Sequence, residues 1–175
     1  MKSRGLLGEE TNLGRIATDE PLSASEEAVW RALMRIVKVL PRHLDNDLVR
    51  GAGLTASEYT TLMHLSEAPN RELRMADLAY ATDLSASRMT RLVDDLQSRS
   101  LVTKTASSSD ARGNVARLTP RGMEKLKSAW HVHLASVRRR FFDSIDAKAL
   151  NGVATALAEV ADHLEDTPAE RRVRS

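Results

Sequence analysis

The sequence predicts a mainly α-helical fold of the α+β class, with several helices and one small β-hairpin. Most of the chain repeats its apolar residues at intervals of three and four, which is the spacing of one buried helix face. Only residues 101–105 and 114–118 alternate as strands do, and a loop of Ser, Asp and Gly separates them. With 175 residues, 42% of them hydrophobic and 29% charged, the chain suffices for one domain with an additional helical arm.

Composition excludes several classes of function. The chain contains no cysteine, which excludes disulfides, thiol catalysis and thiolate metal sites. It has no apolar run of membrane-spanning length and no signal-peptide stretch near its start. It also lacks a Gly-rich phosphate loop, a nucleophile elbow and a paired carboxylate motif. We therefore expect a cytoplasmic protein that is not an enzyme, has no membrane partner and needs no cofactor.

A long first helix is expected over residues 22–50. It follows residues 1–21, which show no period and are predicted to be a disordered tail, as are residues 166–175. Pro41 removes a backbone donor and is expected to kink this helix, and Gly51 and Gly53 are expected to end it. Its apolar stripe consists of Val29, Leu33, Ile36, Val37, Leu40, Leu44 and Leu48.

Two short helices joined by a tight turn are expected further along the chain. Thr55 and Glu58 form a capping box that starts a helix at residues 55–67. A helix at residues 75–81 then meets the polar joint 82–84, and Ser85 caps a longer helix at residues 85–98. This arrangement predicts a helix-turn-helix. The last of these helices is expected to bury Met89, Leu92, Val93 and Leu96, and to leave Ala86, Ser87, Arg88, Thr90 and Arg91 on its outer face.

A β-hairpin at residues 101–119 follows as a wing, which completes a winged helix-turn-helix lobe at residues 54–120. Thr119 caps the next helix and Pro120 begins it. The two helices of residues 120–165 and the first helix carry more apolar surface than one lobe can cover, which predicts a homodimer. The apolar face of the long helix is Met123, Leu126, Trp130, Leu134, Val137 and Phe141, and that of the last helix is Leu150, Val153, Leu157, Val160 and Leu164.

The outer face of the helix at residues 85–98 has the chemistry of a DNA-reading surface. Short hydroxyls and the guanidinium groups of Arg88 and Arg91 suit phosphates and base edges, and Arg117 adds a cation on the wing. The formal net charge is only +2, so binding must come from such a local patch. The few scattered aromatic residues offer no stacking platform for single strands. We therefore expect the partner to be double-stranded DNA.

Three segments carry a resemblance to a known family. They are Leu73-Arg-Met-Ala-Asp-Leu-Ala, residues 85–96, and Asp110-Ala-Arg-Gly-Asn-Val-Ala-Arg-Leu-Thr-Pro-Arg-Gly122. Together they resemble the MarR family of bacterial transcriptional regulators over about residues 25–165, most specifically in the wing. One departure is Ser100, where the family usually has glycine. A serine there must adopt a left-handed backbone at some cost, or the turn must differ.

The resemblance implies roles for individual residues and for the whole protein. Arg112 would enter the minor groove from the wing tip, Asp110 would orient nearby arginines, and residues 85–91 would contact the major groove. It further implies a homodimer on a pseudo-palindromic operator, acting as a ligand-responsive repressor.

The resemblance also implies a small aromatic or anionic effector bound between the dimerisation helices and the DNA-binding lobe. The same residue types are common in ordinary helix packing, so their spacing alone does not demonstrate a pocket. The candidate lining residues are Trp30, Met34, Met63, His64, Trp130 and His131.

Two alternatives keep the fold and change the function. A zinc-responsive regulator could use His43 with His131 or His133 and a carboxylate, but His131 and His133 are two apart on a helix and point in different directions. We therefore predict no metal site. A winged-helix adaptor for another protein would need an apolar anchor on the outer face of the helix at residues 85–98, and that face has none.

Overall fold

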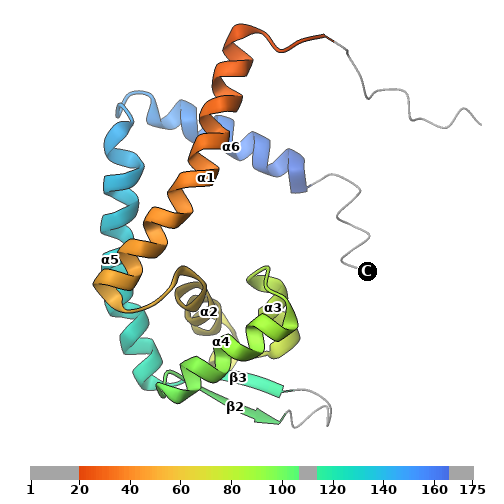
Figure 1. Cartoon of the computed structure of the whole chain (residues 1–175), viewed down its shortest axis with the longest axis vertical. Helices are drawn as coiled ribbons and strands as arrows, with labels where there is room; N and C mark the ends of the chain where they lie inside the picture. Colours follow the sequence, from red (N-terminus) through yellow and green to blue (C-terminus); the bar gives the residue numbers. More distant parts are fainter. Residues whose placement is uncertain (1–19, 107–113, 166–175) are drawn as a thin grey trace, which may run out of the picture. The chain divides into compact units, whose positions relative to one another are not determined.

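A computed structural model describes residues 20–106 and 114–165 of the chain (Figure 1). The elements, in chain order, are α1 (Ala24–Ala52), α2 (Ala56–Glu67), the 3-10 turn η1 (Pro69–Arg71), β1 (Glu72–Arg74), α3 (Met75–Ala81), α4 (Ala86–Ser98), β2 (Val102–Ala106), β3 (Asn114–Leu118), α5 (Pro120–Arg140), the 3-10 turn η2 (Phe142–Ser144) and α6 (Leu150–Glu165). The predicted mainly α-helical fold, a winged-helix lobe between N- and C-terminal helices, is confirmed. Within these described ranges, no helix combines the length and apolar character needed to cross a membrane.

The small sheet has three antiparallel strands in the order β1–β3–β2. The hairpin was predicted, and Val102 pairs with Leu118 at its base. Strand β1 was not predicted, because three residues are too few to show an alternating pattern. Its pairing with β3, in which Glu72 lies opposite Arg117, gives these residues their strand conformation.

The core of the lobe lies between the sheet, helices α2, α3, α4 and α5 and the C-terminal end of α1. The inward positions predicted for α4 are confirmed, except that Leu92 is only partly buried, and α3 buries Leu78 and Ala79. In α2, Tyr59, Leu62 and Leu65 are buried, and Met63 packs against the core while remaining partly exposed. The fully buried large side chains of this core are Leu48, Leu54, Leu62, Leu65, Leu78, Met89, Val93, Leu96 and Val102.

Helix α1 passes through the boundary between two compact units, residues 1–39 and 40–175. The helix continues through Pro41 and through Gly51, so the expectation that Gly51 ends it was wrong. A Cβ atom at Gly51 would lie 2.7 Å from Cγ1 of Val132, so glycine permits the close approach of α1 to α5. Gly53, with a φ of +59°, follows the helix in the left-handed region.

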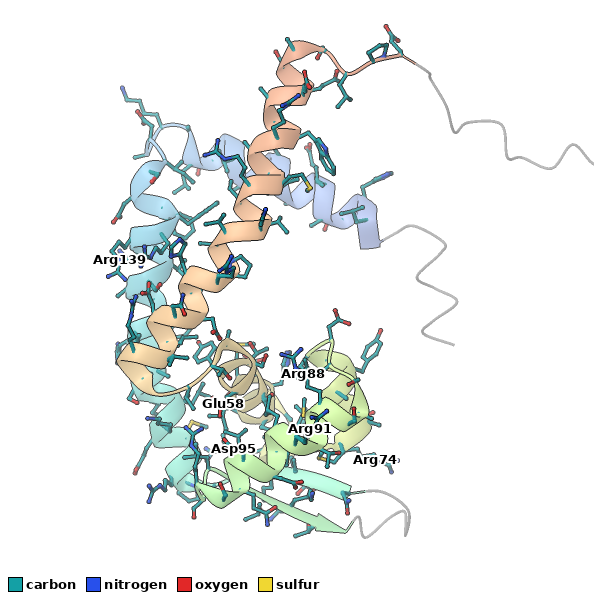
Figure 2. The ribbon with its side chains drawn as sticks, viewed as in Figure 1. Glu58, Arg74, Arg88, Arg91, Asp95 and Arg139 are labelled. Atoms are coloured by element: carbon teal, nitrogen blue, oxygen red, sulfur yellow. The ribbon has the colours of Figure 1, made fainter. Side chains whose placement is uncertain are left out.

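A buried carboxylate joins the C-terminal part of α1 to α5. Asp47 Oδ2 accepts hydrogen bonds from Ser136 Oγ at 2.6 Å and from Arg140 Nε at 3.0 Å. Arg50 also donates to this carboxylate, as does Arg139, which is labelled in Figure 2. The hydrogen bond from Arg140, followed by those from Ser136 and Arg50, holds the pKa of Asp47 well below its usual range.

Helix α5 buries only part of the apolar face predicted for it. Leu126 is buried as expected, together with Ala129 and Ser136, which were not predicted. Trp130 and Leu134, both on the predicted apolar face, remain exposed. The apolar stripe of α5 therefore extends beyond the face that this chain covers, and α6 likewise exposes Leu157, Val160 and Leu164.

Candidate nucleic-acid interface

The joint between α3 and α4 sets the geometry of the helix-turn-helix. Asp83 has a φ of +52°, and its N–H donates to the Tyr80 carbonyl at 3.2 Å. The N–H of Leu84 donates to the Ala79 carbonyl at 2.9 Å. This pair of bonds is a Schellman motif, and aspartate tolerates the left-handed conformation better than most residues. Leu84 then packs against the core, which fixes the direction in which α4 starts.

The N-terminus of α4 exposes the residues predicted to meet DNA. Ser85 is the N-cap, and its Oγ accepts the N–H of Arg88 at 3.4 Å. Met89, Val93 and Leu96 bury one face of the helix. The opposite face is exposed and contains Ala86, Ser87, Arg88, Thr90 and Arg91, of which Figure 2 labels the two arginines.

The cations on this face are not neutralised within the part of the chain that the structure describes. Neither Arg88 nor Arg91 forms an ion pair there, and Arg91 Nε donates only to the Ser87 carbonyl, at 3.4 Å. The Thr90 hydroxyl donates to the Ala86 carbonyl at 2.9 Å, so its oxygen can still accept a hydrogen bond. The face can therefore offer two guanidinium forks and several hydroxyls to a ligand.

Of the three wing residues predicted to meet DNA, the structure describes only Arg117. Arg117 on β3 donates from Nε to Glu72 Oε2 at 2.8 Å, and its Nη2 contacts the same oxygen. This partner lies on β1, the strand that sequence analysis missed, so Glu72 offsets the charge of Arg117. Asp110 and Arg112 lie outside the described residues. An ion pair between Lys104 and Asp94 also joins β2 to α4.

The C-terminus of α4 ends in a second Schellman motif. The N–H of Ser100 donates to Gln97 at 2.8 Å, and the N–H of Leu101 donates to Leu96 at 2.9 Å. Ser100 has a φ of +60°, which confirms that serine adopts the left-handed backbone here. Its Cβ makes that conformation costly, whereas glycine adopts it freely.

Arg99, at the end of α4, is a residue that sequence reasoning missed. Its Nη1 donates to Glu58 Oε1 at 2.5 Å and to Asp95 Oδ2 at 3.1 Å, and its Nη2 donates to the Gly53 carbonyl at 2.9 Å. Glu58 also completes the predicted capping box by accepting the N–H of Thr55 at 2.6 Å. Arg99 therefore ties the end of α4 to the joint between α1 and α2.

Some of the predicted effector residues lie together. A pocket of about 410 Å³ contains Met63, Trp130 and His131 from the predicted set. Of the others, His64 does not line it, and Trp30 and Met34 belong to the unit of residues 1–39. Sequence reasoning missed Tyr59, Ser66, Glu67, Leu126 and Lys127 as further lining residues.

The histidines lie in different surroundings. His43 and His131 are exposed, whereas His133 stacks on Tyr59 with ring centroids 4.8 Å apart. Burial lowers the pKa of His133, and burial also raises the pKa of the Tyr59 phenol. Within residues 20–106 and 114–165, no cluster of three or more His, Asp or Glu side chains could hold a metal ion.

A helix-turn-helix followed by a β-hairpin, with an exposed basic face on its second helix, defines a winged helix-turn-helix protein. The model of the MarR family matches residues 52–113. Sco3205 of Streptomyces coelicolor, a MarR family transcriptional regulator solved in complex with DNA, is 34% identical, with a TM-score of 0.72 over 85% of this chain and 94% of Sco3205. The chain belongs to the MarR family of transcriptional regulators, which are not enzymes.

Further solved structures agree with this assignment. AbsC, another MarR family regulator of Streptomyces coelicolor, is 34% identical with a TM-score of 0.71, and the match covers 85% of this chain and 99% of AbsC. CouR of Rhodococcus jostii RHA1, solved with p-coumaroyl-CoA, is 24% identical with a TM-score of 0.62 over 80% of this chain and 96% of CouR, and shares the fold. No curated protein sequence matches the chain significantly.

Proposed function

We propose that this protein is a dimeric, sequence-specific DNA-binding regulator that acts in the cytoplasm as a ligand-responsive repressor. It binds a pseudo-palindromic operator through the recognition helix at residues 85–98 and the wing at residues 101–119. The observation that carries this proposal is the exposed face of α4, where Arg88 and Arg91 have no ion-pair partner among the described residues. The DNA complex of Sco3205, which is 34% identical, supports the same class of ligand.

The residues of this face have separate tasks in the proposal. Arg91 and Arg88 project from α4 and read base edges or hold phosphates in the major groove, because guanidinium forks match both. The hydroxyls of Ser85, Ser87 and Thr90 bind phosphate oxygens, and Ala86 allows close approach. Arg112 enters the minor groove, Asp110 orients arginines beside it, and Arg117 binds the backbone while Glu72 holds its side chain in place.

The dimer in this proposal is formed by the helices on either side of the lobe. Residues 22–50 and 120–165 supply its interface, because α1, α5 and α6 expose large apolar side chains that a second copy would cover. Two-fold symmetry then places two recognition helices about one helical turn of DNA apart. Trp30, Val37, Trp130, Leu157, Val160 and Leu164 are among the exposed side chains.

An effector fits the pocket that contains Met63, Trp130 and His131. Trp130 offers a ring for stacking, and Lys127 offers a cation for an acidic group. The hydroxyl of Tyr59 is buried and forms no hydrogen bond with any described residue, so a polar ligand atom could accept a hydrogen bond from it. These features support an aromatic or anionic effector.

Selection of bound duplexes from a random pool tests the proposal directly. Wild-type protein should enrich one pseudo-palindromic sequence, and Arg91→Ala should lose about 1–3 kcal/mol of discrimination at one base position. Arg138→Ala, which removes an exposed arginine of α5 outside the lobe, is the matched control and should keep the wild-type preference. Enrichment of no sequence by the wild type, or the same preference in Arg91→Ala, would contradict the proposal.

The wing is tested by the salt dependence of the same binding. Arg112→Ala should weaken binding to all duplexes and reduce the slope of log affinity against log salt by about one, because one cation that lies close to the DNA backbone is lost. A titration at several salt concentrations measures this slope. An unchanged affinity and slope in this variant would remove the wing from the mechanism.

A further inference from the structure

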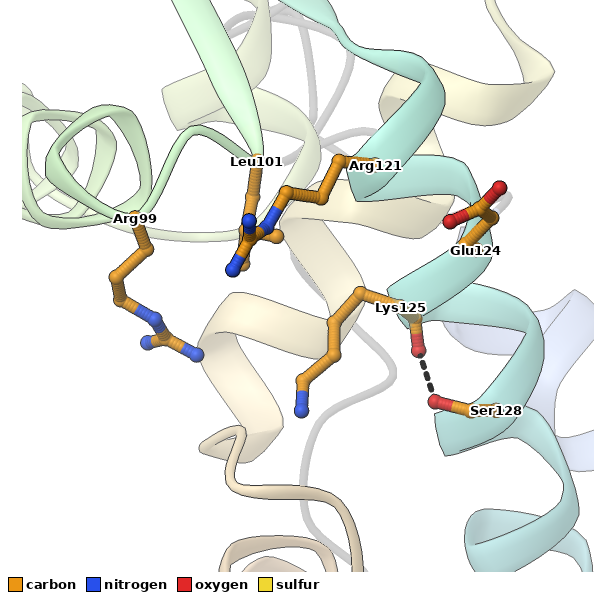
Figure 3. Close-up of a pocket in the computed structure, with 6 residues that line it drawn as sticks. All are labelled: Arg99, Leu101, Arg121, Glu124, Lys125 and Ser128. Carbon is orange, nitrogen blue, oxygen red and sulfur yellow. Dashed lines mark hydrogen bonds between the residues drawn. The ribbon is translucent and has the colours of Figure 1, made fainter.

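A second pocket of the lobe differs in chemistry from the proposed effector pocket. It has a volume of about 450 Å³ and lies between the C-terminus of α4, the start of β2 and the first turns of α5 (Figure 3). Its lining residues are Arg99, Leu101, Arg121, Glu124, Lys125 and Ser128. None of these residues lines the pocket that contains Trp130.

Positive charge dominates this second pocket. The side chains of Arg99, Arg121 and Lys125 extend into the same space, whereas the carboxylate of Glu124 points away from them (Figure 3). Arg121 and Lys125 form no ion pair with any residue that the structure describes. They are four apart on one helix, so their like charges lie close together.

The start of α5 makes these cations more costly still. The first turn of this helix contains no acidic residue, and its positive dipole end repels Arg121. The hydroxyl of Ser128 donates to the Lys125 carbonyl at 2.9 Å (Figure 3). An anion between the three basic groups would relieve both unfavourable interactions.

Arg99 connects this pocket to the DNA-reading helix. Its guanidinium is shared between Glu58, Asp95 and the Gly53 carbonyl. A multiply charged anion in the pocket would compete with these carboxylates for Arg99. Because Glu58 is also part of the capping box with Thr55, such competition would alter the start of α2 and the end of α4 together.

We propose that the pocket lined by Arg99, Arg121 and Lys125 binds a small phosphate-bearing anion. Two guanidinium groups and one ammonium group match the several oxygens of a phosphate or diphosphate group. Binding changes the pairing of Arg99 and thereby the anchoring of α4. The effect on DNA affinity rests on the function proposed above, whereas binding of the anion does not.

Calorimetric titration of the full chain with inorganic pyrophosphate, at fixed ionic strength, tests the binding step. The double variant Arg121→Ala/Lys125→Ala should bind pyrophosphate about tenfold or more weakly than wild type, because two charge-assisted contacts are lost. Arg138→Ala, on the same helix outside the pocket, should bind as wild type does. Equal affinity in all three proteins, or no binding to wild type at millimolar pyrophosphate, would overturn the proposal.

A second double variant, with longer replacement side chains than alanine, shows whether any loss of binding comes from loss of folding. Arg121→Gln/Lys125→Gln keeps side-chain length and should lose pyrophosphate binding while its circular dichroism and melting temperature stay close to wild type. Amide hydrogen exchange measures whether the pocket is coupled to α2 and α4 through Arg99. Pyrophosphate should change the exchange protection of backbone amides at Thr55–Glu58 and at Leu96–Leu101 in the wild type but not in the variant. No change in these segments on saturation would overturn the role of Arg99.

Binding of duplex DNA distinguishes a small phosphate-bearing molecule from the DNA backbone as the occupant of the pocket. If the pocket takes a small molecule, the double alanine variant should keep wild-type affinity for duplex DNA in the absence of pyrophosphate. Wild-type duplex affinity should fall when pyrophosphate is added, and the variant should not respond. Weaker duplex binding by the variant, together with no pyrophosphate binding by wild type, would assign the pocket to the DNA backbone and overturn the small-molecule proposal.

Discussion

The lobe of α2, α3, α4 and the sheet covers nearly all of its large apolar side chains, with Tyr80 exposed, whereas the flanking helices leave many of theirs in contact with solvent. Leu62 of α2 has 0% of its surface exposed, but Leu157 of α6 has 49% exposed. Both leucines follow the same helical spacing in the sequence. The difference teaches that the core of the lobe is formed within one chain, while the exposed apolar faces of α1, α5 and α6 are where the dimer proposed above would form.

The largest expected effect comes from breaking the lobe itself. Leu62→Ala should lower the free energy of unfolding by about 2–5 kcal/mol, because it leaves a cavity in a fully packed core. Denaturant unfolding followed by circular dichroism measures this loss, and the loss should be the same at every protein concentration. Leu157→Ala is the matched control, and its loss should depend on protein concentration, because a dimer is stabilised by mass action. The same dependence on protein concentration in both variants would contradict the distinction between the lobe and the flanking helices.

The second effect concerns assembly. Leu157→Glu combined with Val160→Glu should raise the dimer dissociation constant by roughly 100-fold or more, because each charge would be buried twice in a two-fold interface. Sedimentation velocity across a range of concentrations measures this shift, while circular dichroism should show that the helices remain. A wild-type chain that is monomeric at micromolar concentration, or a double variant that stays dimeric, would contradict the proposed interface.

The ion cluster at Asp47 lies where the covered lobe meets the flanking helices. Because hydrogen bonds from Arg140, Ser136 and Arg50 lower the pKa of Asp47 below 3.8, its stabilisation is fully present above about pH 4. It is lost as the pH falls further and the carboxylate is protonated. Asp47→Asn should lower the melting temperature by several degrees at pH 7, since the arginines would lose their counter-charge.

Melting curves between pH 7 and pH 2 check this prediction. The difference between wild type and Asp47→Asn should shrink below about pH 4, because Asp47 of the unfolded wild-type chain is then protonated, which stabilises the unfolded state while the folded carboxylate stays ionised. Glu159→Gln, an exposed site on α6, should show the wild-type profile throughout. A constant difference across the whole pH range would show that the charge of Asp47 is not responsible.

Local sequence signals predicted the elements whose ends depend on neighbouring residues. The capping box of Thr55 and Glu58, the N-cap Ser85 and the pair Thr119-Pro120 each act within one helical turn, and the structure has all of them. Strand β1 lacked such a signal, because only its pairing with β3 makes it a strand. Which apolar stripe of α5 the chain itself covers also depended on tertiary packing.

In the candidate site, too, features set by neighbouring residues could be predicted and features set by tertiary contacts could not. The outer face of α4 could be predicted, because helical spacing alone decides which of its residues are exposed. The partner of Arg117 is Glu72, which is 45 residues away, and Arg99 meets Glu58 across 41 residues. No spacing rule predicts contacts at such separations, since the fold alone brings these side chains together.

The smallest expected effect tests the one strained turn that the sequence did predict. Ser100→Gly should raise the free energy of unfolding by about 0.5–1 kcal/mol, because glycine adopts a φ of +60° without the clash of a Cβ atom. Part of the gain is offset by the greater freedom of glycine in the unfolded chain. Denaturant unfolding measures the change, and Ser98→Gly, within α4, should instead destabilise by about the same amount. A loss of stability in Ser100→Gly would mean that the serine side chain stabilises the turn more than its backbone strains it.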